Sequence, residues 1–308
     1  MGHRWRAIIG LVVACAGIGT FAAPAGAAIP QTPGAIRDYW TPERMRDARP
    51  VTEALGDTGA ILGGGETAPA EKRGGAEAVP VRHRKRFPKR THGKVYFTIA
   101  GSGNYVCSGT AVNAPSKSLV ITAGHCTYEC VGVLLSCNPT RATNFNFVPA
   151  FKNGDKPFGE WPAQAGGVRA TPQYENNENL AYDVGAAVIA PRNGKEIQEV
   201  LGGGRGIAFK ESANQDYRAF GYPALAPFNG QVPYLCRSGS SGRDNSFNPP
   251  TIRISCDMTA GASGGGWVID GGRIASVTSY GYGSQPGKLY GPYFGSAISN
   301  FYDSVKND

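Results

Sequence analysis

The sequence predicts an all-β protein built from two six-stranded antiparallel β-barrels and a C-terminal helix. The chain of 308 residues contains 44 Gly and 22 Pro, and only 18% of its residues are charged. After residue 90 its apolar residues fall in short runs between Gly, Pro and Asn, without strong helical periodicity. That pattern is typical of β-strands. The runs form two groups around a Gly-rich, charged linker at 191–206, so we expect barrels over about 94–190 and about 207–308.

The first group of runs begins with a hairpin. The turn Gly101-Ser-Gly-Asn104 separates two apolar runs, an arrangement that predicts paired strands. The strands expected in this group are 95–100, 105–112, 118–122, 142–148 and 183–190, with further strands near Trp161 and Val168. A loop is expected between Cys126 and Cys137.

The second group contains another hairpin signal, Gly271-Gly272, between two apolar runs. The strands expected here are 216–222, 231–236, 251–256, 266–270 and 273–279. Near the C-terminus, Ile298, Phe301, Tyr302 and Val305 recur at intervals of three and four residues. This spacing predicts a surface helix over 297–305.

The first 28 residues have the parts of a secretory signal peptide. Arg4 and Arg6 give a basic start, residues 7–21 are apolar, and Ala25-Gly-Ala27 fits a small-residue cleavage site. The alternative is a membrane anchor, but the apolar run is short for the roughly 20 residues that span a bilayer. We therefore expect a secreted, extracellular protein with no membrane segment after signal cleavage.

Residues 29–90 differ in composition from the rest of the chain. They contain no cysteine and few large apolar residues, so a stable core of their own is not expected. Two weakly helical pieces lie at 42–54 and 71–78, and the segment ends in the basic run Arg82-His-Arg-Lys-Arg-Phe-Pro-Lys-Arg90. This run is either a solvated linker or a processing site. Because secretion and the change in composition both favour processing, we expect a propeptide over 29–90 and a mature N-terminus between about 91 and 94.

The basic charge of the chain is concentrated in the part expected to be removed. The formal net charge is +8, and residues 1–90 hold 14 Lys and Arg against 8 Asp and Glu. Residues 91–308 hold the remaining 17 basic and 15 acidic residues, so their net charge is close to neutral. A nucleic-acid partner is therefore not expected, because the remaining domain lacks a basic footprint.

Six of the seven cysteines lie after the expected signal peptide. An even number in an exported chain predicts disulfides, although six cysteines alone allow 15 pairings. A zinc site at Cys126, Cys130 and His125 is the alternative, but no second close pair completes a tetrahedral set. We therefore expect neither a metal nor a cofactor, and structural calcium remains an open alternative. The six residues are Cys107, Cys126, Cys130, Cys137, Cys236 and Cys256.

A small-residue run at 259–267 places one serine, Ser263, among glycines. Gly accepts positive φ and lets other groups approach closely, so such a loop can expose a serine hydroxyl. It can also direct the backbone N–H groups of Gly261 and Ser263 at a developing oxyanion. Alone, the run is equally consistent with a Gly-rich turn.

Two further residues supply the partners that a nucleophilic serine needs. His125 follows a buried apolar run and is the only histidine beyond the basic run and its flanks, which makes it the candidate base. Asp183 stands at the head of another apolar run, where a buried carboxylate needs a hydrogen-bonding partner. Asp183 is either the group that orients the imidazole or a strand-end Asp bonded to backbone.

Together these motifs resemble those of the chymotrypsin-like serine peptidases, in the bacterial secreted branch that includes glutamyl endopeptidases. The order His125, Asp183, Ser263 and the separations of 58 and 80 residues match that family, and the resemblance covers about residues 93–305. It implies that Ser263 attacks the peptide carbonyl, His125 transfers the proton and Asp183 orients the imidazole. The N–H groups of Gly261 and Ser263 would then hold the oxyanion.

The resemblance also implies how the cysteines pair. It implies Cys107–Cys126 beside the histidine and Cys236–Cys256 near the serine loop. Cys130–Cys137 would then close a small loop.

Substrate recognition is less defined by the sequence. The resemblance implies that the strand containing Ser279, Tyr280 and Gly281 binds substrate, and the histidine that glutamyl endopeptidases use near this position is absent. A preference for Glu is therefore not expected. Asp257, six residues before Ser263, is either the reader of a P1 Lys or Arg or a loop-capping carboxylate.

The residue before the nucleophile bears on activation. Trypsins have an Asp there, which pairs with the new N-terminal ammonium, but this chain has Ala262. Activation by that ion pair is therefore not expected.

The sequence thus predicts a monomeric serine endopeptidase that acts on protein or peptide substrates and is made as a preproprotein. A non-catalytic binding protein on the same scaffold is the alternative. A non-peptide esterase fits less well, because α/β-hydrolases place the serine before the acid and the histidine.

Overall fold

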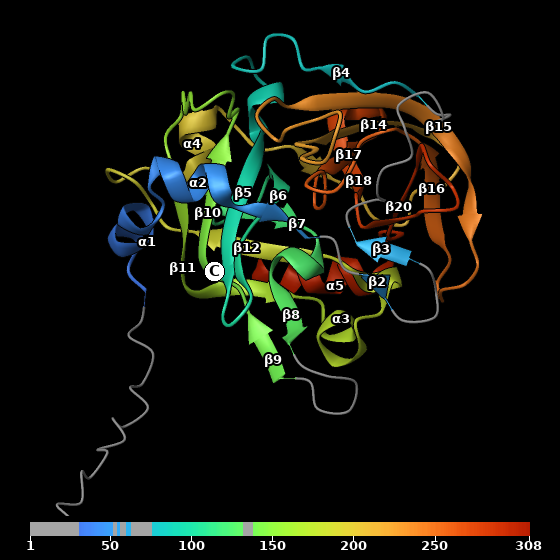
Figure 1. Ribbon diagram of the computed structural model, residues 1–308, viewed down its shortest axis with the longest axis horizontal. Coiled ribbons are helices and arrows are strands. Elements are labelled where there is room, and N and C mark those ends of the chain that lie inside the picture. The colour runs from blue at the N-terminus through green and yellow to red at the C-terminus, as the bar shows by residue number, and fades with distance from the viewer. Residues whose placement is uncertain (1–30, 52–53, 56–59, 63–75, 132–137) are drawn as a thin grey trace, which may run out of the picture. The chain divides into compact units, whose positions relative to one another are not determined.

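The computed structural model describes residues 31–51, 54–55, 60–62, 76–131 and 138–308 (Figure 1). Strands make up most of the elements, and the longest helix, α5 (Ser296–Val305), lies near the C-terminus. The predicted all-β fold with a C-terminal helix is confirmed. The expected signal peptide over 1–28 lies outside the described residues.

The first sheet is a closed barrel of six antiparallel strands. The barrel runs in the order β6–β5–β10–β11–β12–β7, and pairing between β6 and β7 closes it. Its interior is filled by large side chains such as Phe97, Phe147 and Trp161, all buried. The strands are β5 (His92–Ile99), β6 (Gly103–Ala111), β7 (Leu119–Thr122), β10 (Thr143–Pro149), β11 (Trp161–Ala170) and β12 (Gly185–Ile189).

The second sheet follows an open path through the C-terminal half of the chain. Its order is β13–β18–β17–β14–β15–β16–β20–β19, and two short strands from the N-terminal part, β3 and β2, continue it beyond β19. Buried Tyr217, Ile254 and Trp267 belong to its core. The strands are β13 (Gly206–Ile207), β14 (Asp216–Gly221), β15 (Tyr234–Asp244), β16 (Thr251–Ser255), β17 (Gly266–Val268), β18 (Arg273–Val277), β19 (Tyr280–Tyr282) and β20 (Lys288–Gly291).

Several elements differ from the sequence-based expectation. β15 continues to Asp244, eight residues past the expected end of that strand at Cys236, because its Ser- and Gly-rich half pairs with β16 despite lacking an apolar pattern. The expected linker contains helix α4 (Ile197–Leu201), which begins with a capping box between Glu196 and Glu199. The expected loop after Cys126 contains the paired strands β8 (Tyr128–Val131) and β9 (Asn138–Arg141). Helix α3 (Pro172–Asn177) is also additional.

Residues 31–90, here called the N-terminal segment, pack on both sheets. Ile36, Trp40 and Met45 are buried in a cluster with side chains of the first barrel. The segment therefore shares a core with the rest of the chain, as expected of a stretch too poor in apolar residues to form its own. Its elements are α1 (Pro33–Tyr39), α2 (Pro42–Asp47), β1 (Arg49–Pro50), β2 (Ala54–Leu55), β3 (Ala60–Leu62) and β4 (Val79–Pro80).

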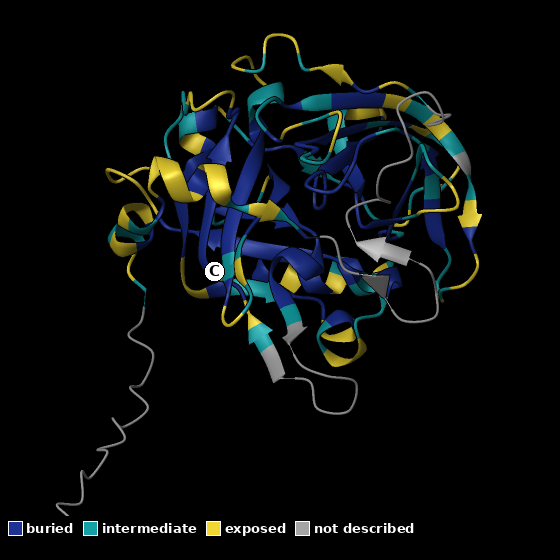
Figure 2. Ribbon diagram, in the orientation of Figure 1, coloured by how far each residue is buried: buried dark blue, intermediate teal, exposed yellow. Residues whose placement is uncertain are grey.

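The strands of the N-terminal segment pair with strands of both sheets. β1 pairs in parallel with β6, β3 pairs with β19, and β4 pairs with β15. Figure 2 shows that buried residues follow the strands, whereas exposed residues gather in helices and connecting loops. No helix within the described ranges is long and apolar enough to cross a membrane.

Candidate active site

His125 lies in a single helical turn, Gly124–Cys126, directly after β7. A disulfide between Cys107 and Cys126 joins this turn to β6, with 6.3 Å between the two Cα atoms. Gly124 leaves room for the site, since a Cβ there would lie 2.9 Å from Oδ1 of Asp183. The turn thus holds the imidazole rigidly beside the carboxylate.

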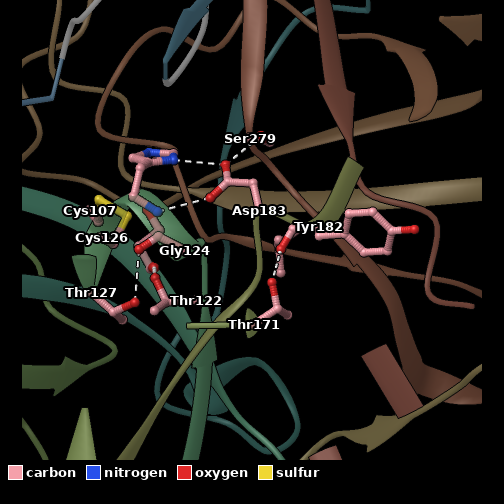
Figure 3. A network of polar contacts seen from close by, with 12 residues as sticks. Cys107, Thr122, Gly124, Cys126, Thr127, Thr171, Tyr182, Asp183 and Ser279 are labelled. Atoms are coloured by element: carbon pink, nitrogen blue, oxygen red, sulfur yellow. Dashed lines mark hydrogen bonds and ion pairs between the residues drawn. A yellow bond between two sulfur atoms is a disulfide. The ribbon is translucent and has the colours of Figure 1, made fainter. Parts of the chain in front are cut away.

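Asp183 is completely buried and receives three hydrogen bonds. The backbone N–H of His125 donates to Oδ1 over 2.9 Å, and Nδ1 of the same residue lies 2.8 Å from Oδ2. The hydroxyl of Ser279 donates to Oδ2 over 2.5 Å, and Figure 3 shows Ser279 beside the carboxylate of Asp183. With Oδ2 accepting from Nδ1, the other ring nitrogen, Nε2, is free to accept a proton.

The hydrogen bonds determine the charge of this carboxylate. Burial by itself raises the pKa of Asp183, because it disfavours the charged form. The neighbouring His125 and the hydrogen bonds from His125 and Ser279 outweigh burial, so that the pKa of Asp183 lies below its ordinary value. Asp183 is therefore an anion that can stabilise a protonated imidazole.

Ser263 stands in a loop that only glycine neighbours permit. Gly261 has φ +95°, and a Cβ there would lie 2.7 Å from the carbonyl oxygen of Tyr222. Gly264 has φ +76°, and its Cβ would lie 2.1 Å from Oγ1 of Thr122. The loop therefore fits tightly against the first barrel in a backbone conformation that other residues rarely adopt.

Ser108 on β6 fixes this loop to the first barrel. Its N–H donates to the carbonyl of Ser263 over 2.7 Å, and its hydroxyl donates to the carbonyl of Gly261 over 2.8 Å. The same hydroxyl accepts from the N–H of Tyr222. Sequence reasoning missed Ser108, although its position next to a cysteine of the expected disulfide was a usable signal.

The backbone N–H groups of the loop differ in their partners. Those of Ala262, Gly264 and Gly265 donate to carbonyls, whereas those of Gly261 and Ser263 donate no hydrogen bond to any described residue. Free N–H groups on either side of Ala262 are the donors that an oxyanion would need.

The reactive atoms of Ser263 and His125 are buried without partners. Oγ of Ser263 and Nε2 of His125 lack a hydrogen bond within the described part of the chain. They therefore do not bond to each other in this state, and hydrogen bonds between catalytic groups often form only in the complex with substrate.

The expected substrate-binding strand lies next to this pair. Ser279 contacts Asp183, and Tyr280 and Gly281 continue into β19. The hydroxyl of Tyr280 donates to Oδ2 of Asp244 over 2.8 Å. β19 is thus bonded to the end of β15, and the residue before it, Ser279, is bonded to Asp183.

Asp257 contacts the N-terminal segment. Its Oδ1 accepts a hydrogen bond from the N–H of Ala78 over 2.8 Å, and its own N–H donates to the carbonyl of Ala76 over 3.3 Å. The Cys236–Cys256 disulfide lies immediately before it, with an S–S distance of 2.05 Å. Between the two earlier interpretations, these contacts favour Asp257 as a residue that binds backbone.

The cysteines bear on the zinc alternative. Among the described residues, the groups able to surround a metal are Cys107, His125 and Cys126, and Cys236, Cys256 and Asp257. Both cysteine pairs are oxidised to disulfides and so present no thiolate ligands. The expected Cys130–Cys137 pair lies outside the residues whose side chains are described.

Two solved structures similar to this chain are proteases. The protease Anisep from Arthrobacter nicotinovorans is 41% identical, with a TM-score of 0.64, over 71% of this chain and 96% of that one. The thermostable serine protease AL20 from an extremophilic microorganism is 35% identical, with a TM-score of 0.63, over 70% of this chain and 97% of that one.

A third structure extends the likeness at the level of the fold. A Glu endopeptidase in complex with MPD is 20% identical, with a TM-score of 0.59, over 76% of this chain and 99% of that one. The chain matches no family model and none of the curated proteins.

Proposed function

This chain belongs to the chymotrypsin-like family of serine peptidases, and we propose that it is a secreted endopeptidase using Ser263, His125 and Asp183. The observation that carries the proposal is the buried His125–Asp183 pair, whose two hydrogen bonds leave Nε2 available, near a serine in a glycine-restricted loop. We also propose that the N-terminal segment is a propeptide.

The reaction proceeds in two steps. Oγ of Ser263 bonds to the peptide carbonyl carbon while Nε2 of His125 takes the hydroxyl proton. The C–N bond then breaks, and the same proton passes to the leaving amine. Water deprotonated by His125 attacks the acyl-enzyme and releases the carboxylic acid and the serine. Asp183 remains charged throughout and stabilises the imidazolium.

The N–H groups of Gly261 and Ser263 stabilise the tetrahedral intermediates. Charge develops on the carbonyl oxygen in both steps, and fixed donors aimed at it lower the barrier. Losing one such donor costs about 3–4 kcal/mol in comparable sites. The contacts of Ser108 support this role, because they fix the carbonyls of Gly261 and Ser263.

Export and processing complete the proposal. Residues 1–28 carry the features of a signal peptide, and the two disulfides fit an oxidising compartment. The basic run contains an exposed stretch, in which Lys85, Arg86 and Phe87 are accessible to a protease. Thr91 and His92 are buried, so the first cut is proposed within the exposed stretch, with trimming toward the expected start at 91–94.

The test is active-site labelling by a fluorophosphonate. The processed wild-type enzyme should be labelled, and Ser263→Ala should abolish the label. Ser212→Ala serves as a matched control, because it changes an exposed serine outside the site that the mechanism does not use. A processed enzyme that folds and does not label would favour a binding protein on this scaffold instead.

A further inference from the structure

β19 is the edge of the second sheet that belongs to the protease domain. Among the described residues, the strands beyond it are β3 and β2, both from the N-terminal segment. The register is antiparallel and pairs Ala60 with Tyr282, Ile61 with Gly281 and Leu62 with Tyr280. Removal of the N-terminal segment would therefore leave β19 with an unpaired edge.

This edge lies next to the catalytic pair. β3 ends at Leu62 opposite Tyr280, and the residue before Tyr280 is Ser279, which donates to Asp183. An exposed strand edge accepts an extended peptide through main-chain hydrogen bonds, with little regard to sequence. A peptide bound along β19 in the direction of β3 would thus run toward the catalytic residues.

The inner side of β19 is held by side-chain contacts. Oδ2 of Asp244 accepts from the hydroxyls of Tyr280 and Tyr282 over 2.8 and 2.6 Å. The rings of Tyr280 and Tyr290 stack with centroids 4.9 Å apart. β19 is consequently a fixed template, and its free edge does not depend on β3 for its position.

We propose that strand 60–62 of the N-terminal segment is a built-in inhibitor, which pairs with β19 along the edge that a peptide substrate would use. The inference rests on the proposed peptidase function and assigns the regulation of that site. The burial of the unpaired Oγ of Ser263 and Nε2 of His125 in the unprocessed chain agrees with it.

The covalent connection makes this inhibition strong before processing. While β3 is part of the same chain as β19, the peptide that connects them sets the effective concentration of β3 at the edge of β19. For short flexible connections this concentration is typically in the millimolar range. A cut in the run Arg82–Arg90 separates the segment from β5 and converts the contact into an intermolecular one. The released segment can then dissociate and leave β19 to substrates.

The first experiment compares full-length and processed bands in one labelled sample. We expect the fluorophosphonate to label the processed band at least about 10-fold faster than the full-length band, as a millimolar local inhibitor requires. Absence of label in both bands would argue against the peptidase function itself. Equal labelling of both bands would overturn the inhibitor proposal and leave the peptidase function intact.

Proline substitutions then test the pairing. Proline removes one main-chain donor from a strand, and successive residues of β3 alternate between bonding to β19 and to β2. Ile61→Pro and Leu62→Pro therefore act as matched controls for each other. One of the two should increase labelling of the full-length band markedly more than the other, and equal, unchanged labelling in both variants would contradict the proposal.

Two measurements do not depend on how these variants fold. A synthetic peptide of residues 54–62 should raise KM of the processed enzyme without changing kcat, and a scrambled peptide should not. In the full-length Ser263→Ala protein, amides of β19 should exchange slowly with solvent, and they should exchange faster after processing by an added protease. Unchanged KM together with unchanged exchange would exclude β3 as the inhibitor.

Discussion

The first sheet closes on itself through β6 and β7, whereas the second ends at β19, where the N-terminal segment adds two more strands. A closed barrel has no continuous free edge, and within the described residues the N-terminal segment adds to it the two-residue strand β1, in parallel with β6. The open sheet keeps one edge beside the catalytic residues. The open sheet is therefore the half that offers a strand edge for pairing with an extended peptide in the proposed function.

The proposed catalytic groups are also divided between the two sheets. His125 and Asp183 adjoin strands of the closed barrel, and Ser263 and Ser279 adjoin strands of the open sheet. The first pair is joined by two hydrogen bonds, whereas Oγ of Ser263 has no hydrogen-bond partner among the described residues. The rigid half thus holds the base in place, and the half with the open edge brings nucleophile and substrate to it.

The largest expected effect comes from breaking the rigid half. Asp183→Asn should lower kcat/KM of the processed enzyme about 10⁴-fold, because the imidazole loses its orienting anion. His125→Ala should lower kcat/KM at least as much. The double variant should lower it little further, since the two residues act as a unit. Steady-state kinetics measure both, with thermal unfolding as the check on folding. Retention of a tenth of the activity in Asp183→Asn would contradict the assigned role.

The next largest effect concerns the N-terminal segment where it meets the closed barrel. Trp40 is buried, and its Nε1 donates to the carbonyl of Asn144 over 2.6 Å. In full-length Ser263→Ala protein, Trp40→Ala should lower the free energy of unfolding by about 3–5 kcal/mol. Glu43→Ala on an exposed position of α2 is the matched control and should change it little. Equal effects of the two variants would show that the segment does not depend on this anchor.

A third prediction concerns a contact between the two halves. Lys94 on β5 is buried, its Nζ donates to the carbonyl of Gly230, and burial lowers the pKa of Lys94 from 10.5 to about 7. Its folded-state pKa lies below the unfolded value, so the cost of burying it is full near pH 7 and disappears above pH 10.5. Lys94→Met should therefore stabilise the protein at pH 7, by an amount of the order of 3 kcal/mol.

The pH dependence distinguishes this explanation from a change in packing. The stability advantage of Lys94→Met should shrink as the pH rises from 7 toward 10.5, because the wild-type lysine becomes neutral in both states. Chemical denaturation at several pH values measures the difference. A constant advantage across this range would indicate a packing effect.

Weakening the one hydrogen bond from the open sheet to Asp183 should have a smaller effect. Ser279→Ala removes a hydrogen bond to a charged group, worth about 1.5–3 kcal/mol, so kcat should fall about 10- to 100-fold. The pKa of Asp183 should rise, because the carboxylate loses one of the hydrogen bonds that lower it. Ser276→Ala is the control: it removes a buried hydroxyl of β18 that donates to the carbonyl of Pro292, and it should leave kcat unchanged.

The sequence predicted the parts of the fold that depend on local patterns. Apolar alternation located most strands of both sheets, and the spacing of Ile298, Phe301 and Val305 located α5. Helix α1 was missed, although Thr32 before Pro33 is an N-terminal capping signal that could have found it. Its stability comes from packing Ile36 against the first barrel, which no local pattern shows.

The site was predictable in its residues and much less in their contacts. His125, Asp183 and Ser263 stand in motifs that are specific in combination. The bridge through Ser108 and the bond from Ser279 to Asp183 join residues 153 and 96 positions apart. Pairing of β3 with β19 is likewise a long-range contact, between two short stretches without a distinctive sequence pattern. It depends on the open edge of the second sheet, which is visible only in the folded structure.

The smallest expected effect concerns the contact between the N-terminal segment and the half of the molecule that contains the open sheet. Asp257 near the open sheet binds the backbone of Ala76 and Ala78. When the N-terminal segment is added to the processed enzyme as an inhibitor, Asp257→Asn should weaken its inhibition only a few-fold. This is the effect expected for a partly exposed hydrogen bond worth about 1 kcal/mol. Because these contacts engage the segment, we expect the P1 profile of the processed enzyme to remain the same. A panel of peptides differing at P1 measures this. Loss of a Lys or Arg preference in Asp257→Asn would instead make Asp257 the residue that reads the P1 side chain.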